Sequence, residues 1–108
     1  MLRNVIIIFD KCYMSGFNTK YESGLEQIRQ EMQQQGISLQ WQAAAAGEDL
    51  AKESQGCLYI TDSPEIFEAL KLKGFYAAAL MHDGNGGVSF QGNCYILQGL
   101  EGMEYAYL

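Results

Sequence analysis

The chain has 108 residues, of which 48% are hydrophobic and 19% are charged, a balance typical of one folded globular domain. Its formal net charge of −6 argues against the clustered basic side chains that bind nucleic acids or anionic membranes, so neither partner is expected. No apolar run is long enough to span a membrane, and no signal peptide is evident. The three cysteines are widely spaced and give no disulfide framework or zinc site. Together these features predict a cytoplasmic protein.

The first part of the chain alternates between strand and helix signals. Residues 4–10 (NVIIIFD) are a continuous apolar run rich in β-branched residues, which is typical of a strand buried on both faces. We expect an irregular loop over 11–19 and a helix over 20–36, where apolar residues recur at helical spacing before Gly36. Residues 37–43 (ISLQWQA) alternate apolar and polar side chains, which predicts an edge strand with one solvated face.

The middle of the chain holds the clearest strand and helix pair. A short helix is predicted over 44–56, and CLYIT (57–61) is a second strand candidate for the buried sheet. The following helix, over 63–74, has Pro64 at its first position and either Ser63 or Asp62 as its cap.

The remaining residues complete an α/β pattern. A third buried strand is predicted over 75–83, a glycine-rich loop over 84–93 and a fourth strand over 94–100, before an apolar tail. Strands that alternate with helices indicate right-handed crossovers and a mainly parallel sheet. We therefore expect residues 1–108 to form one three-layer, Rossmann-like α/β domain with helices on both faces of the sheet.

Acidic residues stand at the ends of three predicted strands: Asp10, Asp62 and Asp83. Parallel pairing would bring these ends to one edge of the sheet, where ligands bind in open α/β folds. Clustered carboxylates favour a shared cation, and Mg²⁺ prefers oxygen ligands, so a magnesium site is one interpretation. The alternative is structural, because aspartate caps helices and forms turns where strands end.

Two further side chains near these ends carry chemistry. His82 is the single histidine of the sequence, and it is either a general base or a hydrogen-bonded structural residue, the second being favoured. Cys12 follows the first strand, but a reactive thiolate needs a nearby cation or a helix start, so it is not expected to be catalytic.

The ending IIIFD of the first strand and the later LYITDSPEIFEALKLKGFYAAALMHDGN resemble the haloacid dehalogenase (HAD) superfamily. The likeness covers residues 4–12 and 57–83. It implies a HAD-like fold, with Asp10 at the position of the phosphoryl-accepting nucleophile and Asp62 at that of a Mg²⁺-binding acid. The sequence departs from the family where a second aspartate, the general acid/base, would stand, because that residue is Cys12. Lys52 is the nearest counterpart to the family lysine.

A second likeness concerns an accessory region. The second half of the chain is similar to the N-terminal region of some bacterial GNAT-type acetyltransferases. The likeness runs from LYITDSPEIFEALKLKG through ALMHDGN to FQGNCYILQGLEGMEYAYL. The resemblance implies an N-terminal domain of a longer protein, with an acetyltransferase domain following in cis. The acetyl-CoA loop of that family, Arg/Gln-x-x-Gly-x-Gly/Ala, is absent from these residues.

Three functional hypotheses follow. The first is a non-catalytic HAD-like accessory or regulatory domain of an acetyltransferase, without a cofactor of its own. The second is a minimal Mg²⁺-dependent phosphatase with Asp10 as its nucleophile and Asp62 and Asp83 as metal ligands. The third is an interaction module in which the edge strand over 37–43 pairs with another subunit, for example in a homodimer.

Overall fold

A computed structural model describes residues 3–16, 19–45, 56–82, 85–90 and 96–98. Its regular elements are listed here in chain order: β1 Asn4–Asp10, the 3₁₀ helix η1 Lys11–Gly16, α1 Thr19–Gln34, β2 Ser38–Ala44, β3 Cys57–Thr61, α2 Pro64–Leu72, β4 Ala77–Met81 and β5 Ile96–Gln98. The alternation of strands and helices confirms the predicted α/β class.

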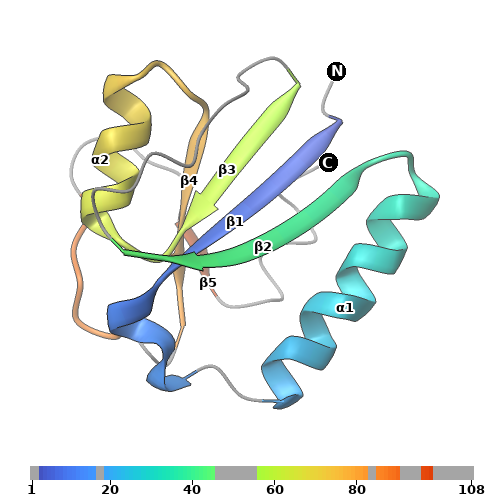
Figure 1. Cartoon of the computed structure of the whole chain (residues 1–108), viewed down its shortest axis with the longest axis horizontal. Coiled ribbons are helices and arrows are strands. Elements are labelled where there is room, and N and C mark those ends of the chain that lie inside the picture. The colour runs from blue at the N-terminus through green and yellow to red at the C-terminus, as the bar shows by residue number, and fades with distance from the viewer. Residues whose placement is uncertain (1–2, 17–18, 46–55, 83–84, 91–95, 99–108) are drawn as a thin grey trace.

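The strands form one five-stranded sheet in the order β2-β1-β3-β4-β5, and every pairing among them is parallel (Figure 1). β1 is therefore flanked by β2 on one side and by β3 on the other, with Ile8 opposite both Gln42 and Thr61. Because all five strands run the same way, their carboxyl ends lie at one edge of the sheet. β2 lies at the outside of the sheet, which confirms the predicted edge strand.

The two helices pack on opposite faces of the sheet, which gives the three layers that the sequence predicts. α1 places three apolar residues at helical spacing, Leu25, Ile28 and Met32, into a cluster with residues of β1 and β2. α2 places Ile66 and Leu70 into a second cluster on the other face. The strand residues buried in the first cluster are Val5, Ile7, Phe9, Leu39, Ile60, Ala78 and Leu80; those in the second are Ile8, Ala44, Cys57 and Tyr59.

Glycine ends both helices where the sequence predicts an end. α1 stops at Gln34, and Gly36 takes the left-handed conformation with φ +79° while the N–H of Ile37 donates to the carbonyl of Met32. The same arrangement closes α2, where Gly74 has φ +81°. A side chain would be strained at either position, so these glycines determine the helix ends.

Three sequence expectations need correction. Residues 11–16 are not an irregular loop but the 3₁₀ helix η1, which is a common short connector directly after a strand. The strand predicted over 75–83 begins later, at Ala77. The N–H of Phe75 still donates to the carbonyl of Leu70 in α2, whereas the exposed Tyr76 already accepts from the N–H of Tyr59 in β3. β2 extends to Ala44, one residue into the short helix predicted over 44–56. Ala45 and Gly56 are not helical, and residues 46–55 lie outside the described residues.

Within the described part of the chain, neither α1 nor α2 has the length and apolar character that crossing a membrane requires.

Candidate functional site

The carboxyl ends of β1, β3 and β4 meet at one edge of the sheet, and each supplies a polar residue there. Asp10 is the last residue of β1, Asp62 follows β3, and His82 follows β4. These strands are neighbours in the sheet. The prediction that parallel pairing gathers these ends is confirmed for Asp10, Asp62 and His82, whereas Asp83 lies outside the described residues.

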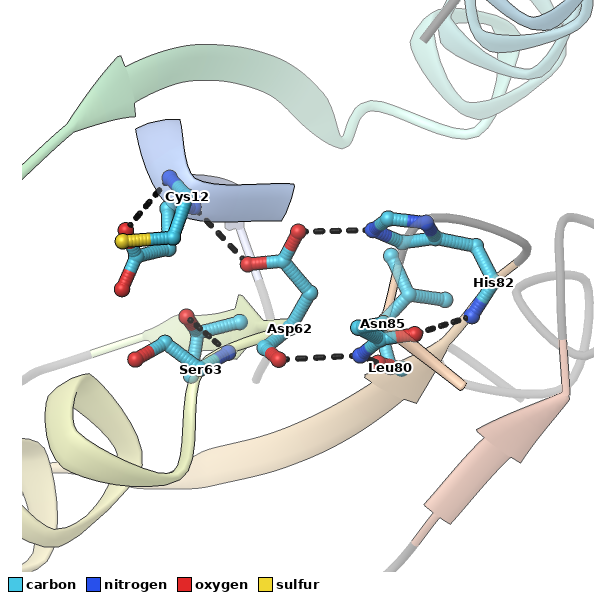
Figure 2. A network of polar contacts seen from close by, with 8 residues as sticks. Cys12, Asp62, Ser63, Leu80, His82 and Asn85 are labelled. Carbon is cyan, nitrogen blue, oxygen red and sulfur yellow. Dashed lines mark hydrogen bonds and ion pairs between the residues drawn. The ribbon is translucent and has the colours of Figure 1, made fainter. Parts of the chain in front are cut away.

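Asp62 is fully buried, and both of its carboxylate oxygens contact protein groups. Oδ1 accepts a hydrogen bond of 2.8 Å from the backbone N–H of Asp10, which continues the β1–β3 ladder past its last strand pair. Oδ2 lies 2.6 Å from His82 Nε2, in a pair whose side chains are 0% and 8% exposed (Figure 2). An ionised carboxylate only accepts, so the ring nitrogen is the donor. Asp62 thus links β3 to both β1 and β4.

Asn85 completes this arrangement from the turn after β4. It is 1% exposed, and its Nδ2 donates to the carbonyl oxygens of Asp62 (2.9 Å) and Leu80 (2.8 Å). Its Oδ1 accepts from the backbone N–H of His82 at 2.7 Å (Figure 2). The amide therefore holds the His82 backbone in place while it joins the ends of β3 and β4. We call Asp10, Asp62, His82 and Asn85 the strand-end network.

Sequence reasoning missed Asn85, which it treated only as part of a glycine-rich loop. The available signal was an asparagine in a turn directly after a buried strand, where its side chain commonly bonds to nearby backbone groups. His82 was read correctly as a hydrogen-bonded residue. Its ring also meets Phe9 edge-on, with centroids 6.1 Å apart, which helps to orient the imidazole toward Asp62.

Ser63, not Asp62, caps α2. The Oγ of Ser63 accepts from the backbone N–H of Ile66 at 3.3 Å, and Pro64 follows at the first helical position. The hydroxyl of Thr61 in turn accepts from the N–H of Ser63 at 3.2 Å. Of the two caps that the sequence left open, Ser63 and Asp62, the structure has Ser63, and the Asp62 carboxylate contacts Asp10 and His82 instead.

Asp10 and Cys12 contact each other in the first turn after β1. The Asp10 residue is 3% exposed, and its Oδ1 accepts from the Cys12 backbone N–H at 2.9 Å. The pKa of the Cys12 thiol is raised, first by its hydrogen bond to the Asp10 carboxylate and then by the negative charge of that group. A raised pKa leaves little thiolate at neutral pH, so this exposed thiol is a poor nucleophile.

Both carboxylate oxygens of Asp62, a predicted Mg²⁺ ligand, contact protein groups. Among the described residues, no group of three or more His, Cys, Asp or Glu side chains is placed to hold a metal ion. Both carboxylate oxygens of Asp62 already accept from protein donors in a site without solvent exposure. The full predicted set of Asp10, Asp62 and Asp83 stays a prediction, because Asp83 is outside the described residues.

The remaining residues that the sequence singled out are divided between the core and the undescribed segments. Cys57 is buried at the start of β3, as expected for a small core residue. Lys52 and Cys94 lie outside the described residues.

A scan against protein-family models gives no match for this chain, and a search of curated proteins gives none either.

Proposed function

We propose that the chain is a non-catalytic, HAD-like α/β domain that serves as an accessory or regulatory part of an acetyltransferase-type protein. One observation carries the non-catalytic part of the proposal. The carboxylate of Asp62, the residue that the HAD resemblance assigns to Mg²⁺ binding, is buried and bonded through both oxygens to Asp10 and His82.

Phosphomonoester hydrolysis of the HAD kind would also need an acid/base two residues after the nucleophile. That position holds Cys12, a thiol that is a weak acid and is made weaker because the Asp10 carboxylate raises its pKa. Asp10 itself accepts a backbone hydrogen bond and is 3% exposed, so it offers little access to a phosphoryl group. The carboxyl-end edge therefore supports a structural role better than a catalytic one.

The acetyltransferase association comes from the sequence resemblance. The described residues supply an α/β unit and no acetyl-CoA loop, which fits a domain that acts on a neighbour rather than on acetyl-CoA. We expect the neighbour to be a catalytic domain in the same polypeptide, whose activity or stability this unit adjusts.

Two variants test the non-catalytic part. Wild type and Cys12→Asp, which restores an Asp-x-Asp pair, are assayed with p-nitrophenyl phosphate and millimolar Mg²⁺. We expect no turnover from either protein, because Asp62 stays bonded in both. Mg²⁺-dependent turnover that disappears in Asp10→Asn would overturn the proposal and favour the minimal phosphatase.

An NMR titration with Mg²⁺ gives a second readout that does not depend on the chosen phosphate ester. We expect the amide signals of Asp10, Asp62 and His82 to keep their positions. Shifts confined to those residues would show that the cation displaces His82 from Asp62, and would contradict the proposal.

The accessory role is tested in an acetyltransferase that carries residues 1–108 ahead of its catalytic domain. We expect removal of this segment to leave acetyl-CoA binding intact and to change the turnover or the thermal stability of the catalytic domain. Identical kinetics and melting temperature with and without the segment would refute that role.

A second candidate function, an edge-strand interaction module, is favoured by one observation. β2 is an outermost strand of the described sheet, and the side chains of Ser38, Gln40 and Gln42 on one of its faces are exposed.

A further inference from the structure

Within the described residues, β2 is an edge strand without the charged side chains, proline, bulge or shortness that normally prevent edge-to-edge pairing. Proteins protect such edges with charged side chains, proline, bulges or very short strands. β2 is seven residues long, reads SLQWQAA, and pairs with β1 in unbroken register from Ser38 to Ala44. No charged residue occurs between Ile37 and Ala46, although the chain as a whole carries a net charge of −6.

The hydrogen bonds to β1 show which backbone groups of β2 point away from the sheet. The N–H of Ser38 donates to the carbonyl of Arg3 at 2.9 Å, so Ser38 and the residues two and four positions later face β1. In a parallel strand the intervening residues direct both N–H and C=O to the opposite side. Those residues are Leu39, Trp41 and Ala43, and they form a row of donors and acceptors at the edge.

We propose that β2 pairs antiparallel with β2 of a second copy of this chain, across a two-fold axis at Trp41. In this register Trp41 lies opposite Trp41 of the partner subunit, and Leu39 lies opposite Ala43 of the partner subunit. All three outward-facing residues then meet their counterparts as hydrogen-bonded pairs, which exchange both backbone bonds. The two sheets become one continuous sheet, and the interface is the same patch on both copies, as two-fold symmetry requires.

The side chains of β2 suit this register. Gln40 and Gln42, both exposed, fall opposite Gln42 and Gln40 of the partner subunit in non-hydrogen-bonded pairs, where cross-strand side chains approach most closely. Each amide both donates and accepts, so the glutamines are complementary to themselves. On the other face the half-buried Trp41, which packs against the α1-side core, lies next to Trp41 of the partner subunit in this register.

The uncharged sequence around β2 and its self-complementary glutamines suit a second copy as the occupant of this edge. Two chains of net charge −6 repel each other over most of their surfaces, and the uncharged segment 37–46 is a place where they can approach without like charges in contact. This inference names the partner and register of the edge-strand module given above as the second candidate function. It does not depend on the proposed accessory role, so either can fail without the other.

Sedimentation equilibrium over a range of protein concentrations tests the proposal with charge-patterned variants. Gln40→Lys with Gln42→Lys places lysine opposite lysine of the partner subunit, and should raise the dimer dissociation constant about tenfold or more. Gln40→Lys with Gln42→Glu places lysine opposite glutamate and should restore dimerisation at least to the wild-type level. A matched control, Gln30→Lys with Gln34→Lys on the exposed side of α1, adds the same charge away from the edge and should leave dimerisation near wild type.

Amide hydrogen exchange locates the interface independently. We expect the N–H groups of Leu39, Trp41 and Ala43 to become more protected as the protein concentration rises, while exposed amides elsewhere do not. A wild-type protein that is monomeric at every concentration overturns the proposal. So does a double-lysine variant that dimerises as tightly as wild type, because the contact would then lie elsewhere.

Discussion

The strand-end network and the β2 edge are both polar parts of the same sheet, but the polar side chains are buried in the first and exposed in the second. In the strand-end network, the side chains of Asp62 and Asn85 are buried and bonded to protein groups on neighbouring strands. Along β2, Gln40 and Gln42 lie in water and the outer backbone groups point away from the sheet. We therefore expect the buried polar groups to determine the stability of this fold, and the exposed ones to be available for the association proposed at β2.

The largest effect on stability is expected at Asp62. Replacement by alanine leaves the N–H of Asp10 and the ring of His82 without their carboxylate partner, and should cost about 4 kcal/mol of unfolding free energy. Asp62→Asn keeps an oxygen for the Asp10 N–H and should cost about 1 kcal/mol. Urea unfolding followed by circular dichroism measures both variants. Equal losses for the two would mean that the carboxylate charge, and not the lost contacts, determines the effect.

The next effect is expected at Asn85. Asn85→Ala removes three hydrogen bonds and leaves two buried carbonyl oxygens unpaired, which should cost about 3 kcal/mol. Gln42→Ala on the β2 edge is the matched control and should change stability by less than about 0.5 kcal/mol, because it truncates an exposed side chain. Urea unfolding followed by circular dichroism measures the unfolding free energy of both variants. A loss at Gln42 as large as that at Asn85 would remove the distinction between the two regions.

The smallest effect concerns the reactivity of Cys12 and leaves stability nearly unchanged. The hydrogen bond and charge of Asp10 raise the pKa of this exposed thiol, so its reaction with a disulfide reagent at pH 8 should be slower than that of a free cysteine. Asp10→Asn keeps an acceptor for the Cys12 N–H but removes the charge. The pKa should then fall, the thiolate fraction at pH 8 should grow, and the reaction should become several-fold faster.

Cys12→Ser serves as the control that assigns the observed thiol reaction to Cys12. An unchanged rate in Asp10→Asn would show that the Asp10 carboxylate does not act on this thiol.

How far the sequence could predict the site depended on how local each signal is. Ser63 and Pro64 mark the start of α2 within a few residues, and the structure bears out that start. The meeting of Asp62 with His82 and Asn85 joins residues 20 and 23 positions apart, and its bond to the Asp10 amide spans 52 positions. No repeat or cap signal covers such distances, because these contacts exist only once the strands are ordered in the sheet.

The sequence by itself determined the α/β class, the buried strands over 4–10 and 57–61, the glycine ends of both helices and the edge character of the strand near Trp41. Apolar periodicity, capping and turn chemistry are local, so each can be read within one turn or one strand. The tertiary structure decided the strand order and, with it, the partners of Asp62. A buried carboxylate takes the donors that neighbouring strands bring to it, and here those donors are the Asp10 amide and the His82 ring.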